Sequence, residues 1–159
     1  HTFKDMLDDF RNRYNTSLMF KKSDSLEADL STVSLLIIAG HGSGDQIKMG
    51  SGTDESQYID NTDAELCAQL GTLPQDAKIF LFSCLAGKGI AKYIADCAKG
   101  RDIIASTEPF SADEIITIDQ YPFKATIEVN PRSPYHINPF TGKEKPAENK
   151  TVVFNYPIN

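Results

Sequence analysis

The stretch LLIIAGHGSGD, residues 35–45, joins the pattern of a buried strand to a turn rich in glycine. The five residues from Leu35 to Ala39 are all apolar and include two isoleucines, which is typical of a strand buried on both faces. The glycines at positions 40, 42 and 44 are not expected to continue that strand. The sequence therefore predicts that His41 lies at the carboxyl end of a strand.

The rest of the first 110 residues alternates between strand and helix patterns. Two further strand candidates are KIFLFSC at 78–84 and RDIIAST at 101–107. Apolar residues at helical spacing open the chain, recur from residue 61 or 62 as far as Leu73, and recur again before Gly100. Such alternation predicts an α/β domain with parallel core strands, in which ligands bind beyond the carboxyl ends of the strands. His41 and Cys84 both lie at such ends.

The pattern of residues changes after Phe110, where helical spacing no longer occurs. EIITID at 114–119 and FKATIEV at 123–129 predict β segments, a region rich in proline and polar residues follows, and TVVF at 151–154 predicts a last short strand. The segment after His41 predicts a surface loop or a short hairpin around Ile47 and Met49. We interpret residues 1–159 as one domain with a core of about 1–110 and a β and loop extension of about 111–159.

The charge and hydrophobicity of the chain argue against some classes of binding partner. The chain has 159 residues, of which 40% are hydrophobic and 24% charged, and its net charge is −6. No cluster of Lys and Arg is dense enough to follow a phosphate backbone, which argues against nucleic acid or an anionic membrane as the main partner. No apolar run approaches the length of a membrane span. The chain begins with His1 rather than Met, which predicts a processed or excised piece of a longer protein.

Three cysteines are present, an odd number whose spacing fits neither a zinc site nor a dense disulfide framework. We therefore expect reduced thiols in a cytosol-like compartment, with a secreted effector as the alternative. Cys67 and Cys97 lie among apolar residues at helical spacing and are expected to pack in the core. No metal site and no organic cofactor are predicted.

The placement of Cys84 favours a catalytic role for its thiol. It follows a strand pattern and precedes LAGKG, which leads into a helical segment, so helix N–H groups and the nearby Lys88 would favour its thiolate. His41 would act as general base and acid, and the N–H groups of Gly42 and Cys84 would hold an oxyanion. The alternative is that Cys84 is a small core residue and His41 an ordinary turn residue. Their joint placement at one sheet edge favours the functional pair.

The arrangement of LLIIAGHG followed by IFLFSC resembles the caspase-like superfamily of cysteine peptidases, which includes caspases, gingipains, separase and CHAT domains. IFLFSCLAGKGIAKYIADCAKGRDIIAST is similar to the CHAT-like branch in particular. The resemblance spans about residues 33–107. It implies a caspase-like three-layer sandwich with a mainly parallel sheet, and a cysteine endopeptidase that forms an acyl-enzyme. By the same resemblance His41 is the general base and acid, Cys84 the nucleophile, and the Gly42 N–H part of the oxyanion hole.

The chain departs from this family in two places. Phe82 stands where caspases carry a polar or charged residue that helps to bind the P1 side chain of the substrate, and by its position it is a candidate for substrate binding. The family also places a central strand before its first helix, whereas this chain starts at that helix. A missing N-terminal segment or an activating partner would account for the second departure.

Asp45 and Glu108 are further candidates for the same site. Asp45 would orient His41 or meet substrate from the same loop, and Glu108 would meet a basic P1 side chain, although a solvated surface acid is the alternative for both. His136 is interpreted as a loop residue. Ile90 stands where a tyrosine phosphatase needs arginine, and neither a nucleotide P-loop nor a GxSxG motif occurs. The rival function is an inactive caspase-like module that binds a protein partner through the glycine-rich loop and the proline-rich tail.

Overall fold

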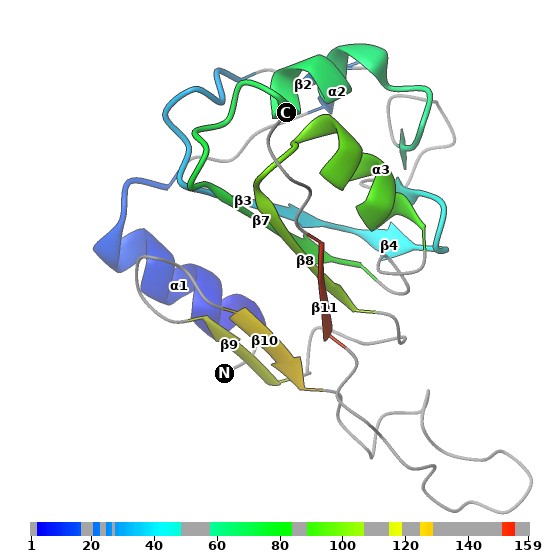
Figure 1. Ribbon diagram of the computed structural model, residues 1–159. Coiled ribbons are helices and arrows are strands. Elements are labelled where there is room, and N and C mark those ends of the chain that lie inside the picture. Colours follow the sequence, from blue (N-terminus) through cyan, green and yellow to red (C-terminus); the bar gives the residue numbers. More distant parts are fainter. Residues whose placement is uncertain are drawn as a thin grey trace, which may run out of the picture.

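The computed structural model describes residues 3–16, 21–22, 25–26, 28–48, 58–83, 89–106, 115–118, 125–128 and 151–154. Figure 1 shows the arrangement of its elements. In chain order these elements are α1 (Phe3–Arg13), β1 (Lys21–Lys22), β2 (Ser25–Leu26), β3 (Leu35–Ala39), β4 (His41–Gly42), β5 (Ile47–Lys48), β6 (Tyr58–Ile59), α2 (Ala64–Leu70), β7 (Lys78–Phe82), α3 (Ile90–Cys97), β8 (Asp102–Ser106), β9 (Ile115–Ile118), β10 (Ala125–Glu128) and β11 (Thr151–Phe154).

The central sheet has the strand order β11-β8-β7-β3 within the described residues. The three apolar segments predicted as strands form its parallel part, in which β7 pairs with β3 on one side and with β8 on the other. β11 pairs with β8 in the antiparallel direction. The expectation of an α/β fold with parallel core strands is therefore confirmed, and TVVF adds an antiparallel strand to the same sheet.

Burial along the strands follows their position in the sheet. The four residues from Ile79 to Phe82 are buried on the central strand β7, which is typical of a strand covered on both faces. In β3 burial alternates instead: Leu36 and Ile38 are buried, whereas the residues on either side of each are half-buried. The prediction that 35–39 is buried on both faces is wrong in this respect, because among the described strands β3 is the last of the sheet.

Helices α2 and α3 cover one face of the sheet, and α1 lies on the other side with the hairpin of β9 and β10 (Figure 1). The apolar faces of α2 and α3 pack on the alternate side chains of β7 and β8. The large buried residues that these four elements contribute to the core are Leu66, Leu70, Ile79, Leu81, Ile90, Ile94 and Ile103. Among the described helices none is long and apolar enough to cross a membrane.

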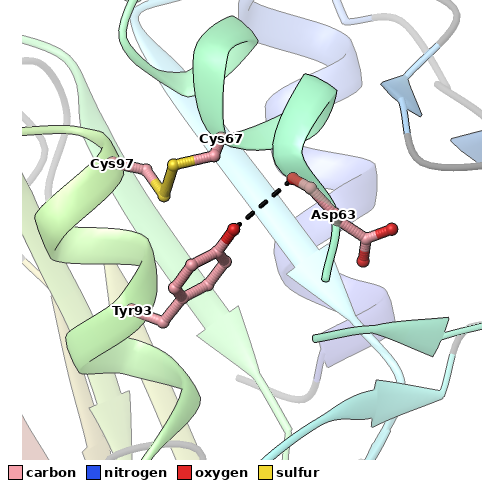
Figure 2. The surroundings of a disulfide bond; sticks show 4 residues. All are labelled: Asp63, Cys67, Tyr93 and Cys97. Atoms are coloured by element: carbon pink, nitrogen blue, oxygen red, sulfur yellow. Dashed lines mark hydrogen bonds between the residues drawn. A yellow bond between two sulfur atoms is a disulfide. The ribbon is translucent and has the colours of Figure 1, made fainter. Parts of the chain in front are cut away.

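A disulfide bond joins Cys67 of α2 to Cys97 of α3 (Figure 2), so the expectation of reduced thiols is wrong for these two residues. Their Cα atoms lie 4.9 Å apart, within the range that a disulfide spans. Both residues are half-buried between the helices, so they occupy the edge of the core. The argument for a reducing compartment no longer applies to this chain. Spacing along the sequence could not reveal the pair because it is formed by the packing of two separate helices.

Two polar side chains fix α2 to its surroundings. The amide of Gln69 donates to the Leu26 carbonyl oxygen (2.8 Å) and accepts from the Leu26 N–H (2.7 Å), as a neighbouring strand would. The guanidinium of Arg101, 6% exposed, donates to four carbonyl oxygens, and three of them belong to the turn that follows α2. Those three acceptors are Gly71, Leu73 and Pro74. Both contacts satisfy backbone groups near an end of the helix or of a short strand.

We expect Arg101→Met to lower the free energy of unfolding by about 2–3 kcal/mol, because the apolar replacement leaves the buried carbonyl oxygen of Leu73 and three partly buried ones without this donor. Urea denaturation measures this change. Lys99→Met is the matched control, since Lys99 is exposed in the same turn and its replacement is expected to change stability by less than about 0.5 kcal/mol. Equal stability of the two variants would contradict the assigned role of the guanidinium.

Candidate active site

The backbone of β3 continues past its last residue toward His41. The N–H of Gly40 donates to the carbonyl oxygen of Phe82 at 3.1 Å, which extends the pairing of β3 with β7 by one step. His41 then begins β4, which leaves the central sheet and pairs with β5. His41 was predicted at the carboxyl end of a strand; it lies two residues after the end of β3 and is the first residue of β4, so the glycines at 40 and 42 do not end extended structure. They carry it into a second, three-stranded sheet of β4, β5 and β6.

Close packing explains the glycine before His41. A Cβ atom at Gly40 would lie 2.3 Å from the carbonyl oxygen of Lys48, a backbone atom on the paired strand β5. Such a distance is not tolerated, so only glycine fits at this crossing. The imidazole of His41 itself is exposed. An exposed imidazole at the rim of the sheet is accessible to a substrate.

The loop after His41 rests on the N-terminus of α3. Gly44 has a φ of 96°, and its carbonyl oxygen accepts the N–H of Ile90, the first residue of α3, at 2.7 Å. A Cβ atom at Gly89 would lie 2.7 Å from that same oxygen. We call this the Gly44–Ile90 contact. It takes the place of a side-chain cap, which α3 lacks, and it links the loop of His41 to the helix that follows Cys84 in the sequence.

Asp45 lies on the same loop and is exposed. Its Oδ1 atom would lie 3.1 Å from a Cβ atom at Gly89, so the carboxylate lies beside the start of α3. The positive end of the helix dipole favours a negative charge at this place. Within the described residues no hydrogen bond joins Asp45 to His41. No direct contact therefore supports the prediction that Asp45 orients the imidazole.

The end of β7 is buried. Phe82 is 5% exposed, and its ring stacks on Phe80 with the centroids 4.4 Å apart. Ser83 is 1% exposed, and no residue in the described part of the chain hydrogen-bonds its hydroxyl. Sequence reasoning did not single out Ser83. Its signal is a hydroxyl that follows four buried apolar residues immediately before a candidate nucleophile.

Cys84, Glu108 and His136, together with Met49 of the predicted hairpin, lie outside the described residues. The structure does describe what leads up to Cys84. Ala39 of β3 pairs with Phe82 of β7 in the parallel register, and His41 and Cys84 each follow their member of this pair by two positions in the sequence. Sequence reasoning also missed the Gly44–Ile90 contact, for which the glycines at 44 and 89 were the available signal.

No group of three or more His, Cys, Asp or Glu residues that could hold a metal ion occurs in the described part of the chain. Comparison of the chain with protein-family models, with curated proteins and with solved structures found no match.

We expect Gly89→Ala to displace the loop that carries His41, because its methyl group would meet the Gly44 carbonyl oxygen at a distance that real Cβ atoms do not show. Overpacking of this kind costs about 1–3 kcal/mol of stability. Amide hydrogen exchange is expected to show a faster rate at Ile90, and thermal unfolding to show a lower midpoint. Ser43→Ala, an exposed position in the same loop, is the control and should change neither. Retained protection at Ile90 in Gly89→Ala would contradict the packing described here.

Proposed function

We propose that the chain is a caspase-like cysteine endopeptidase in which Cys84 and His41 form the catalytic dyad. The observation that carries the proposal is the parallel register of β3 and β7, which pairs Ala39 with Phe82. Because parallel strands deliver their carboxyl ends to one edge of a sheet, residues that follow this pair at equal distance are candidates for one site. The resemblance of LLIIAGHG and IFLFSC to the caspase-like superfamily points to the same two residues.

The architecture supports this proposal. The parallel core of β3, β7 and β8 has helices on both sides, as in a three-layer sandwich, and α3 follows the strand that precedes Cys84 (Figure 1). The loop of His41 contacts the start of α3 through the Gly44–Ile90 contact. The loop of His41 is thereby held at the helix that follows Cys84 in the sequence.

The proposed reaction is an acyl transfer through the thiol. His41 removes the proton from Cys84, and the thiolate attacks the carbonyl carbon of the scissile peptide bond. The N–H groups of Gly42 and Cys84 hold the oxyanion of the tetrahedral intermediate. His41 then gives the proton to the leaving amine, which departs and leaves a thioester. Water, deprotonated by His41, hydrolyses the thioester and restores the thiol.

We assign substrate specificity to the loops at the carboxyl ends of the parallel strands. Phe82 is buried in the interior, and its apolar ring offers no charge or hydrogen bond to a substrate. Asp45, by contrast, is exposed on the loop of His41, and Glu108 follows β8 by two positions in the sequence. Both are proposed as the acidic groups that contact substrate. The substrate is a protein or peptide, and the proposed chemistry needs no metal or organic cofactor.

Digestion of a proteome-derived peptide library, read by mass spectrometry, tests the proposal. The unaltered chain is expected to create new peptide termini, and Cys84→Ala and His41→Ala to lower the rate by about 10³-fold or more, as loss of a nucleophile or its base does. Ser43→Ala, exposed in the same loop as His41, is expected to keep the activity. Full activity of Cys84→Ala would refute the mechanism.

Thiol reactivity separates the peptidase from an inactive binding module. In an active dyad Cys84 is alkylated by iodoacetamide at a lower pH than a free cysteine in a short peptide, because the imidazole favours the thiolate. The disulfide removes Cys67 and Cys97 from competition, so one site of alkylation is expected in the folded chain. His41→Ala should shift the pH profile of alkylation toward that of the free peptide. An identical profile for both chains would favour the binding module.

A further inference from the structure

The three-stranded sheet of β4, β5 and β6 carries one row of polar side chains that begins at His41. His41 of β4 pairs with Lys48 of β5, and Lys48 pairs with Tyr58 of β6. Residues directly opposite one another on neighbouring strands project from the same face of a sheet, so these three side chains are neighbours. Neighbouring strands lie about 4.8 Å apart. Lys48 is therefore the cross-strand neighbour of the candidate base, and Tyr58 is one strand further away.

The opposite face of this small sheet belongs to the hydrophobic core. Ile47 and Ile59 pair with each other, and both are fully buried. Because side chains alternate between the two faces along a strand, Lys48 and Tyr58 point away from that core. Lys48 and Tyr58 are half-buried, and His41 is exposed. The row of His41, Lys48 and Tyr58 thus forms an outward surface beside the candidate base.

The ammonium group of Lys48 is oriented but not neutralised. Its Nζ atom lies over the ring of Tyr58, 5.8 Å from the ring centroid, which is a cation–π contact. Within the described residues no carboxylate forms an ion pair with it, although the chain has 22 Asp and Glu against 16 Lys and Arg. Lys78, by contrast, is ion-paired with Asp102. Lys48 therefore offers its positive charge to a ligand that binds along the row.

We propose that Lys48 and Tyr58 form a subsite for an acidic side chain of the substrate. The ammonium group donates to the carboxylate of a substrate Asp or Glu, and the CH₂ groups of that side chain pack on the Tyr58 ring. The assignment rests on the proposed function, because it takes the scissile bond to lie at His41. It gives the substrate a second determinant besides the basic group that Asp45 and Glu108 would meet.

Strand spacing indicates which substrate residue reaches this subsite. Two strand spacings, about 10 Å, separate the backbone of His41 from that of Tyr58, and the Lys48 ammonium lies on the Tyr58 side of its own strand. An extended peptide advances about 3.3 Å per residue. The acidic residue is therefore placed two or three positions from the scissile bond.

The peptide-library digest by the unaltered chain first identifies the preferred residues at these positions. A cleaved peptide is then synthesised in two forms that differ only in Glu or Gln there. We expect the Glu form to have a kcat/KM about three- to fivefold higher, chiefly through a lower KM, as a partly exposed ion pair provides. Added salt should reduce this preference, because it screens the charges.

Variants of Lys48 assign the preference to its charge. Lys48→Met is expected to abolish the preference and to keep kcat/KM for the Gln form within about twofold, since the apolar stem is retained. Lys48→Arg should keep the preference, and Lys48→Glu should reverse it toward a peptide with Lys at the same position. Lys99→Met, which removes the same charge at an exposed position beyond the far end of α3, is the control and should match the unaltered chain.

The outcomes separate the subsite from the peptidase. Cleavage without an acidic preference at these positions overturns the subsite and leaves the proposed function standing. An equal loss on both peptides in Lys48→Met, or the same loss of preference in Lys99→Met, also overturns the subsite, because the effect is then structural or one of overall charge. If Lys48→Met does not fold, Lys48→Arg and Lys48→Glu give the decision. Absence of cleavage by the unaltered chain overturns the proposed function and the subsite with it.

Discussion

The parallel pairing of β7 with β3 and β8 is the constraint on which the rest of the fold depends. Parallel strands need crossover connections, so the chain must place α2 between β3 and β7 and α3 between β7 and β8. Both helices lie on the same face of the sheet, where their apolar residues form one core with the alternate side chains of β7 and β8. The disulfide between α2 and α3 is possible only because this topology makes the two crossover helices neighbours.

The same pairing also fixes the start of the His41 loop. Gly40 is hydrogen-bonded to the end of β7, and Gly44 is hydrogen-bonded to the start of α3. The loop is therefore fixed at two points that belong to successive elements of the chain. The backbone of the loop is held by neighbours on both sides, while the imidazole itself stays exposed. A group that must meet substrate and still keep its position needs this combination of a held backbone and an accessible side chain.

Local sequence patterns were sufficient to predict the main strands and helices, because each has an apolar run or a helical period of its own. The ends were less exact: the helix predicted as far as Leu73 ends at Leu70, and α3 ends at Cys97, three residues before Gly100. Contacts between separate helices and strands leave no comparable pattern in the local sequence. The disulfide, the carbonyl oxygens bound by Arg101 and the strand-like role of Gln69 each join residues that are distant in sequence. The alternating burial of β3 likewise depends on its place at the end of the described sheet. For the site, the sequence predicted His41 at the end of a strand, but not the hydrogen bond that joins Gly44 of the same loop to the start of α3.

The burial of β7 also limits where substrate recognition can reside. Phe80 and Phe82 lie on one side of the strand and stack on each other, while Ile79 and Leu81 pack under the helices on the opposite side. Both faces of the strand are thus used for the core from Ile79 to Phe82, which leaves no side chain in this part of β7 to select a substrate. A peptidase built on this strand must recognise its substrate through loops beyond the strand ends. The loop of His41 is the described loop at this edge, and its backbone is held at the start of α3 by the hydrogen bond from Ile90 to Gly44.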